Sequence, residues 1–401
     1  MKNVTYGSRR VHALLALALL LGCGAGVKAQ LAPDLTRTNL ASIDTTYNYS
    51  LGPTGLRGWL YRDGRNVGDF GTMTAQKPWQ ILIVTVGANT PASGIILSND
   101  VILGVSTGVG QLPVPLFTND ARKSIGWAIG AAEATDGWLN LKRWRAGGTS
   151  DVSIQLPLSN LSYSATAPYD CPKSALILSN ALTIIATKSF SGAPAGPVLG
   201  LALLASGNTN YLPKVRAYAH SLTPANLTLD PNACDTWGWG YKNVFLAEYF
   251  LATGDPNVLS GIAQYTVALA KAQSLYGTFG HGGAEQHADG SLHGSIPWYG
   301  PVNSAGLVAN LAIVMGRKCL VASGGVLDPE INPAIDRGAK FFAYYVGKGS
   351  IPYGEHEPWA GGHASNGKDS MAAMFYAMQG DRPVETEYYT RMTVAGYNGR
   401  E

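Results

Sequence analysis

The sequence predicts a multidomain protein, with a small β-rich domain followed by an all-α domain built from helical hairpins. Between residues 46 and 160, short runs rich in β-branched residues alternate apolar and polar positions, which is typical of strands. From residue 168 onward, apolar residues recur with the 3.6-residue period of helices. Residues 165–170 lie between the two patterns, and Pro168 interrupts any structure continuing through them, so they predict a linker.

The composition of the 401-residue chain is that of a folded protein with a nearly neutral body. Charged residues make up 14% and hydrophobic residues 46%, which excludes an intrinsically disordered chain. The formal net charge is +3, and four of the basic residues lie in the first 29 positions, which contain no acidic residue. The remainder therefore lacks the basic surface of a nucleic-acid-binding protein, and no nucleic-acid partner is expected.

Residues 1–29 have the pattern of a signal peptide. Two arginines precede the apolar run Ala13–Leu21, which is too short to span a bilayer, and small residues at 27 and 29 predict cleavage after Ala29. We therefore expect a secreted or periplasmic protein with no transmembrane segment. In an alternative interpretation, the sequence ending in Cys23 resembles a bacterial lipobox, and the protein is lipid-anchored through this cysteine.

The three cysteines beyond this segment, Cys171, Cys234 and Cys319, lie far apart in the sequence and cannot all pair. We expect each to be a buried free thiol and not part of a disulfide framework. An alternative role for Cys234, which is followed by an acidic residue, is that of a nucleophile.

The first domain, residues 46–160, contains strand patterns and one amphipathic helix. The helix is predicted over 119–133, with Thr118 or Asn119 as its cap, because Ile125 and Ile129 share one apolar face with three alanines. The predicted strands cover residues 79–86, 100–105, 138–144 and 152–156. Strands, one helix and a closing hairpin indicate a small barrel with a helix on one side.

The order of these pieces resembles a PDZ domain of the bacterial type. The match rests on four features in the same order as in that family. The hydrophobic-Gly-hydrophobic loop corresponds to Leu56-Arg57-Gly58-Trp59, and the Ser-Pro-Ala-like turn corresponds to Asn89-Thr90-Pro91-Ala92. The Gly-Asp-Val-Ile-like strand corresponds to Asn99-Asp100-Val101-Ile102-Leu103, and the closing hairpin corresponds to Arg145-Ala146-Gly147 followed by Val152-Ser153-Ile154. Arg57 departs from the family, which usually has an apolar residue there.

The resemblance implies a groove for a peptide or a protein C-terminus. Backbone N–H groups of Leu56, Arg57, Gly58 and Trp59 would hold the peptide carboxylate, and the neighbouring strand edge would accept the peptide as an extra strand. Ile125 and Ile129 would line the opposite wall. In the alternative interpretation, the chain's own residues fill this groove and the domain is a spacer or an internal dock.

The second domain, residues 168–401, repeats a helical hairpin. Leu204-Ala205-Ser206-Gly207 and Leu251-Ala252-Thr253-Gly254 are offset by 47 residues, and the apolar residues that follow each keep this offset. The glycine ends one helix, and Asn, Asp or Pro starts the next. Nine helices are predicted, over 172–188, 197–206, 211–222, 241–253, 257–274, 303–319, 330–347, 367–379 and 384–394.

These hairpins resemble the α/α-toroid of six-hairpin glycosidases, polysaccharide lyases and terpenoid cyclases, which build their sites at one mouth. Together with the first domain, they resemble an uncharacterised family of secreted bacterial proteins that combines a PDZ-like domain with a toroid-like one. The predicted helices make about four and a half hairpins, fewer than a closed ring of this type has. We therefore expect an incomplete toroid, either because the polypeptide is a fragment or because a partner covers the open edge.

Five histidines lie in long Gly- and aromatic-rich connections, which hold the candidate site. In the first of three hypotheses this is a sugar-processing site of a polysaccharide hydrolase or lyase, because paired carboxylates act as acid and base and aromatic faces stack on sugar rings. Its catalytic candidates are the carboxylates Glu355 and Glu357, with His293, Tyr299 and His356 as proton carriers. Its substrate-binding candidates are His281, Trp298, Tyr353 and Trp359.

The second hypothesis is a metal site, because His281, His287 and His293 are evenly spaced with Glu285 between them. This spacing matches no tight ligand motif, so neither a metal nor another cofactor is expected. The third hypothesis is structural, with His and Glu side chains bonding helix ends.

The sequence thus favours an exported protein that binds or processes an extracellular glycan at the mouth of the helical domain, while the PDZ-like module docks a peptide or partner. The alternative is a non-enzymatic scaffold or adhesion protein that uses the PDZ-like module for protein–protein interaction. Convergence of Glu355, His356, His293 and Tyr299 in one open cleft would favour the enzyme.

Overall fold

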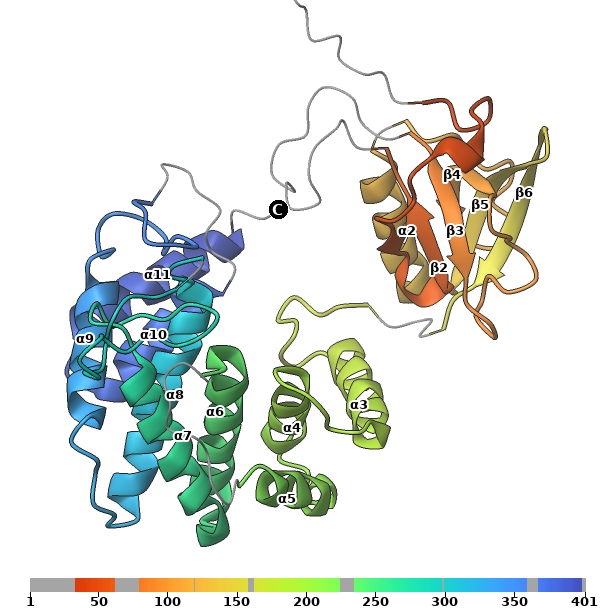
Figure 1. Cartoon of the computed structure of the whole chain (residues 1–401). Coiled ribbons are helices and arrows are strands. Elements are labelled where there is room, and N and C mark those ends of the chain that lie inside the picture. The colour runs from red at the N-terminus through yellow and green to blue at the C-terminus, as the bar shows by residue number, and fades with distance from the viewer. Residues whose placement is uncertain are drawn as a thin grey trace, which may run out of the picture. The chain divides into compact units, whose positions relative to one another are not determined.

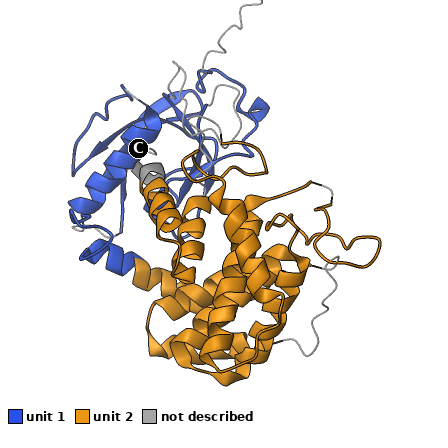
Figure 2. Ribbon diagram, turned by 90° about the vertical axis from the view of Figure 1, so that its left-hand side faces the viewer, with its two compact units in different colours: residues 1–177 blue, residues 178–401 orange. Residues whose placement is uncertain are grey.

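The computed structural model describes residues 33–61, 79–118, 120–157, 162–223, 234–297, 299–358 and 367–398, with side chains of the last helix described as far as residue 394. The chain divides into two compact units, residues 1–177 and 178–401 (Figure 2). We call them the sheet unit and the helical unit. The predicted signal peptide, Cys23, Trp298 and Trp359 lie outside the described residues.

The sheet unit is built on a six-stranded antiparallel sheet whose spatial order follows the sequence (Figure 1). The strands are β1 (Tyr49–Ser50), β2 (Leu56–Trp59), β3 (Ile81–Val86), β4 (Val101–Thr107), β5 (Trp138–Arg145) and β6 (Gly148–Gln155). The last four confirm the predicted strands within a few residues. β1 was not predicted, and the predicted loop over 56–59 is in fact strand β2.

One helix, α2 (Ala121–Ala134), packs on this sheet and closes its core. Ala121, Ile125 and Ala132 are buried, so the predicted apolar face is confirmed. The predicted cap is wrong by one or two residues: the carboxylate of Asp120 accepts a hydrogen bond from the Arg122 backbone N–H at 2.9 Å. An Asp is among the strongest N-caps because its carboxylate satisfies an otherwise unpaired N–H.

The nine helices predicted for the C-terminal half are all present among the described residues (Figure 1). They are α3 (Pro172–Thr187), α4 (Ala195–Ala205), α5 (Leu212–Ser221), α6 (Thr236–Thr253), α7 (Leu259–Ala272), α8 (Asn303–Ala322), α9 (Ile331–Ala343), α10 (Lys368–Gln379) and α11 (Pro383–Asn398). The boundary between the two units falls within α3. A β-sheet region followed by a helical region therefore confirms the coarse architecture.

The repeated hairpin turns have the predicted chemistry. Gly207, Gly254 and Gly380 each have a positive φ, of 65°, 68° and 85°, which a glycine adopts without steric cost. After the first two, Asn208 and Asp255 accept hydrogen bonds from the backbone N–H two residues on, and so start the next helical turn. The two turns related by the 47-residue offset, at Gly207 and at Gly254, therefore have the same geometry.

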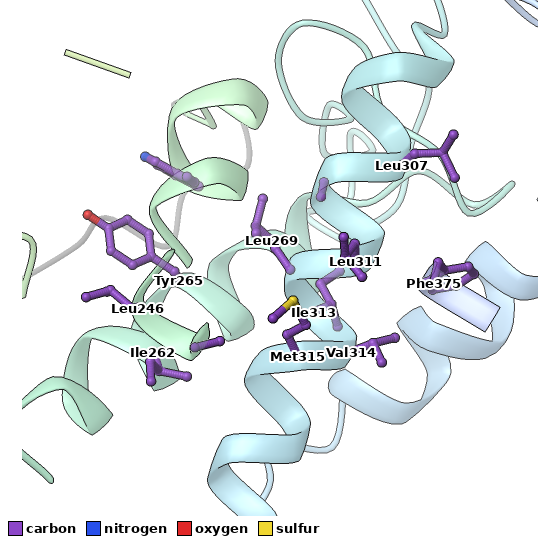
Figure 3. Packing of buried hydrophobic residues seen from close by; sticks show 14 of the residues in the cluster. Leu246, Ile262, Tyr265, Leu269, Leu307, Leu311, Ile313, Val314, Met315 and Phe375 are labelled. Carbon is purple, nitrogen blue, oxygen red and sulfur yellow. The ribbon is translucent and has the colours of Figure 1, made fainter. Parts of the chain in front are cut away.

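Helix α8 lies at the centre of the helical unit. It packs against α6, α7 and α10, and its side chains Leu311, Ile313 and Met315 lie in the main hydrophobic core (Figure 3). Gly316 allows α8 to approach α7, because a Cβ atom there would lie 1.9 Å from the Thr266 hydroxyl. By length and composition α8 is apolar enough to cross a membrane, yet 78% of its apolar window is buried in the helical unit.

Candidate functional site

Two of the long connections meet the N-terminal ends of α6 and α8. The backbone N–H of Asn303, at the start of α8, donates to the Tyr353 carbonyl at 2.8 Å, and its side chain donates to the Gly354 carbonyl at 2.7 Å. The N–H of Thr236, which begins α6, donates to the His281 carbonyl at 3.3 Å. The connections that contain His281 and Tyr353 are therefore joined at one end of the helical unit.

Five rings from these segments form a continuous series, which we call the aromatic row. Its neighbours are Tyr241 and Trp237 at 6.4 Å between ring centroids, Trp237 and His281 at 6.3 Å, His281 and Tyr299 at 6.1 Å, and Tyr299 and Tyr353 at 6.0 Å. These separations lie in the range of favourable ring pairs. Tyr299 is 69% exposed and Tyr353 is 41% exposed, so this end of the row presents ring surface to solvent.

A cavity of about 300 Å³ opens beside the aromatic row. Its side-chain lining combines an imidazole, a carboxylate and a phenol with apolar residues, and the lining residues are His281, Gly282, Gly283, Glu285, Ile296, Pro297, Tyr299 and Gly300. Gly282 and Gly283 contribute only backbone atoms to this lining. A concave surface with a few polar groups among apolar ones is typical of a small-molecule site.

The tautomer of His281 follows from its partner. The indole Nε1 of Trp237 donates to His281 Nδ1 at 2.9 Å, and an indole nitrogen can only donate. Nδ1 is therefore the acceptor, and the neutral imidazole carries its proton on Nε2. His281 thus offers a donor to a ligand in the cavity.

Comparison with known proteins identifies a family for the helical part. A family model described as a domain of unknown function, DUF6288, matches residues 174–401, which is more than half of the chain. The chain belongs to this family. No curated protein and no solved structure matches it.

Three exposed polar groups of the DUF6288 domain, two of them in the cavity lining, have no protein partner among the described residues. Within the described residues, neither the Glu285 carboxylate, the Glu355 carboxylate nor the Tyr299 hydroxyl makes a hydrogen bond or an ion pair. Glu285 and Tyr299 line the cavity, and Glu355 lies two residues beyond Tyr353 of the aromatic row. These groups are exposed to solvent and are therefore available to a ligand.

The remaining catalytic candidates of the DUF6288 domain are engaged elsewhere. His293 contacts the Gln273 carbonyl at 2.6 Å through Nδ1 and the Glu330 carboxylate at 3.1 Å through Nε2. His356 Nδ1 contacts the carbonyl of Glu357 at 2.8 Å, and the Glu357 carboxylate accepts a hydrogen bond from the Tyr344 hydroxyl. Of the five predicted catalytic residues, only Tyr299 lines the cavity, and no contact joins Glu355, His356 and His293 within the described part of the chain.

Trp237 and Tyr241 are site residues that the sequence did not predict. They stand four apart, one helical turn on α6, inside a Gly- and Trp-rich segment. That segment was a usable signal. What the sequence could not supply was the bond from Trp237 to His281, which lies 44 residues away.

The structure argues against Cys234 as a nucleophile. Like Cys171 and Cys319, it is a buried free thiol, as predicted. Burial raises the pKa of the Cys234 thiol to about 12, so it is protonated at neutral pH and is a poor nucleophile. Among the described residues, no cluster of three or more His, Cys, Asp or Glu side chains could hold a metal ion.

A second cavity, of about 380 Å³, lies in the sheet unit between β1 and α2. Ile125 and Ile129 line it together with Tyr49, Ser50, Leu51, Gly52, Leu60, Arg122 and Gly126. The wall predicted for α2 is therefore present, but the residues of the predicted carboxylate loop are not part of this cavity.

The predicted loop residues lie on β2, which has a neighbour on each side. Gly58 pairs with Tyr49 of β1 and with Ile83 of β3, and the Arg57 guanidinium donates to the Asn48 carbonyl at 2.9 Å. Leu56 is buried and Trp59 is half-buried. The chain's own strand β1 thus occupies the edge of β2 that was predicted to accept a peptide.

Proposed function

We propose that the helical unit of this chain binds a glycan on the aromatic row and in the adjoining cavity. The observation that carries the proposal is the exposed end of the row, where Tyr299 presents 69% of its surface to solvent beside unengaged carboxylates. Exposed rings offer flat apolar faces to the C–H face of a sugar ring, and carboxylates accept hydrogen bonds from its hydroxyl groups.

Contiguous exposed apolar surface often marks a site that contacts a ligand or a partner, whereas single exposed apolar residues are common. A run of rings flanked by carboxylates suits a ligand that is itself both apolar and rich in hydroxyl groups, which is the chemistry of a sugar. We also propose that the helical hairpins form part of a toroid-like domain, in which connections that meet at one end would form the mouth of the site. Export directed by residues 1–29 would deliver the protein to extracellular polysaccharides.

Binding has more support than catalysis. A glycoside hydrolase needs two free carboxyl groups about 5 to 9.5 Å apart on either side of the scissile bond. Glu357 is instead bonded to Tyr344 and lies 3.8 Å from the Lys348 ammonium. Glu285 and Glu355 are the free carboxylates of the described site, and any hydrolysis would depend on them.

The test is a binding assay of the purified chain against a panel of soluble oligosaccharides, with the variant Tyr299→Ala. We expect binding by the wild type and about a tenfold loss in the variant, because an aromatic contact contributes about 1 kcal/mol in addition to the free energy of burying its surface, and about 1.4 kcal/mol in total is tenfold. Tyr276→Ala is the matched control, since Tyr276 lies in the same connection, is 70% exposed and pairs with no described ring. Equal loss in both variants, or no binding at all, would contradict the proposal.

Cleavage is tested on the same panel by assaying new reducing ends and unsaturated products. If the chain cleaves a glycan, Glu355→Gln and Glu285→Gln should each abolish the activity, because those carboxylates are the only unengaged ones in the described site. Activity that survives both substitutions would remove these residues from any mechanism.

A second candidate function belongs to the sheet unit, which we propose is PDZ-like and docks an apolar peptide between β1 and α2. The cavity lined by Ile125 and Ile129 supports it, and so does the order of strands and helix. Binding of a fluorescent peptide library should be lost in Ile129→Asp and kept in Thr135→Asp at the far end of the same helix. Retention of peptide by Ile129→Asp would exclude this groove as the dock.

A further inference from the structure

The ionisable groups around the cavity give it a negative character. The described lining contains one carboxylate, Glu285, and one imidazole, His281, whose Nδ1 is already occupied by the Trp237 donor. A second free carboxylate, that of Glu355, belongs to the residue two positions after Tyr353, whose ring is at the exposed end of the aromatic row. No Lys or Arg side chain lines this cavity among the described residues.

The lysine nearest to Glu355 along the chain is also engaged. Lys348 lies 3.8 Å from the Glu357 carboxylate, and its ammonium stands 3.2 Å from the centroid of the Tyr344 ring. This ammonium is therefore neutralised by a carboxylate and an aromatic face. A polyanionic ligand would therefore meet unpaired carboxylates, and the Lys348 ammonium would not be free to pair with it.

We infer that the site selects glycans without acidic groups and prefers those whose sugars carry a free amine. This inference rests on the proposed function, since it names the substrate class of the same aromatic row. A glycan of uronic acids would bring one negative charge per residue to a cavity lined by the Glu285 carboxylate, and like charges repel. A protonated amino sugar instead places a cation where carboxylates and ring faces both attract it.

Two independent attractions favour the amine. The Glu285 carboxylate, which no described side chain neutralises, would accept a charge-assisted hydrogen bond from the ammonium group. The faces of Tyr299 and Tyr353 attract a cation through their ring quadrupoles. A neutral sugar keeps the ring stacking but lacks both of these contributions, so it binds with intermediate affinity.

The experiment compares three β-1,4-linked oligomers of equal length, made of glucose, glucosamine or glucuronate. Glucose and glucosamine differ only at C2, and glucose and glucuronate only at C6, so each comparison isolates one charge. By isothermal titration at low salt, we expect glucosamine oligomers to bind about tenfold more tightly than glucose oligomers, and glucuronate oligomers more weakly than both.

The variant Glu285→Gln should reduce the ratio of glucosamine to glucose affinity to about threefold or less, because one charge-assisted hydrogen bond is lost. Glu387→Gln is the control and should leave the ratio unchanged, since this exposed glutamate lies on α11 and pairs with Arg391 at 2.6 Å. Added salt should also lower the ratio.

The outcomes separate the inference from the proposed function. If glucuronate oligomers bind as tightly as glucosamine oligomers, or if Glu285→Gln leaves the ratio unchanged, the inference is overturned, while sensitivity to Tyr299→Ala still supports glycan binding. If none of the three oligomers binds, or if Tyr299→Ala changes no affinity, the proposed function fails and the inference fails with it.

Discussion

Two histidines in the connection between α7 and α8, His281 and His293, differ in what their side chains contact. His281, near its start, lines a cavity, and its only described side-chain hydrogen bond is to Trp237. His293, twelve residues later, is half-buried, has a φ of 69°, and bonds Gln273 and Glu330 through its two ring nitrogens. One connection therefore supplies both an imidazole that lines a cavity and an imidazole, that of His293, which joins α7 to α9 and which we call the structural clip.

The difference lies in what surrounds each ring and not in the loop itself. His293 lies between the end of α7, which provides the Gln273 carbonyl, and α9, whose Arg337 Nη2 is 3.2 Å from its Nε2. His281 faces the start of α6 and the cavity. Both polar atoms of His293 are used in holding the fold, whereas Nε2 of His281 remains available.

The largest expected effect comes from breaking the structural clip. His293→Ala should lower the free energy of unfolding by about 2 kcal/mol, because a buried carbonyl and a carboxylate lose their partner. Urea denaturation measures this change. His281→Ala is the matched variant and should change the free energy by no more than about 0.5 kcal/mol. Equal losses in the two variants would erase the distinction between the two histidines.

The reciprocal experiment measures binding. His281→Ala should weaken binding of the glycan found in the panel by about fivefold, because it removes one ligand donor worth about 1 kcal/mol. His293→Ala, titrated at a temperature where it is fully folded, should bind like the wild type. If the losses are reversed, the cavity beside Tyr299 is not the binding site.

A third histidine, His220, leads to a prediction of a smaller effect, a pH dependence of the free energy of unfolding. Hydrogen bonds from His220 and Tyr249, each at 2.8 Å, lower the pKa of the Asp255 carboxyl below its usual value near 4. Since the folded-state pKa is depressed, the stabilisation is present above pH of about 4 and is lost as the pH falls below it. The free energy of unfolding of the Asp255→Asn variant should therefore depend less on pH in this acid range than that of the wild type.

The measurement is urea denaturation of the wild type and Asp255→Asn from neutral pH down to about pH 3. The difference between the two free energies should shrink as the pH falls. A difference that stays constant across this range would mean that the geometry of the hairpin turn, and not the charge of Asp255, determines the difference in stability between the two proteins.

Local patterns were sufficient to predict most of the fold. The helices were predictable because apolar periodicity and Gly-Asn or Gly-Asp turns are encoded within each hairpin, as at Gly207 and Gly254. Strand β1 has two residues and β2 contains Gly58, so neither carries a recognisable strand pattern. Their pairing depends on partners elsewhere in the sheet.

The candidate site was predictable in residue type but not in arrangement. Histidines and aromatic residues in Gly-rich connections indicated His281, Tyr299 and Tyr353, which the structure places in the aromatic row. The sequence did not show that His293 would bond Glu330, 37 residues away, because that contact is decided by the packing of α7 against α9. Local sequence cannot distinguish a free imidazole from an engaged one when the partner lies on another helix.

The most direct test of the central claim is isothermal titration of the glucosamine oligomer into the wild type, Tyr299→Ala and Tyr276→Ala. The aromatic row predicts binding by the wild type and by Tyr276→Ala with equal affinity, and about tenfold weaker binding by Tyr299→Ala. Equal affinity in all three proteins, or no heat of binding in any of them, would contradict the claim that this surface recognises a glycan.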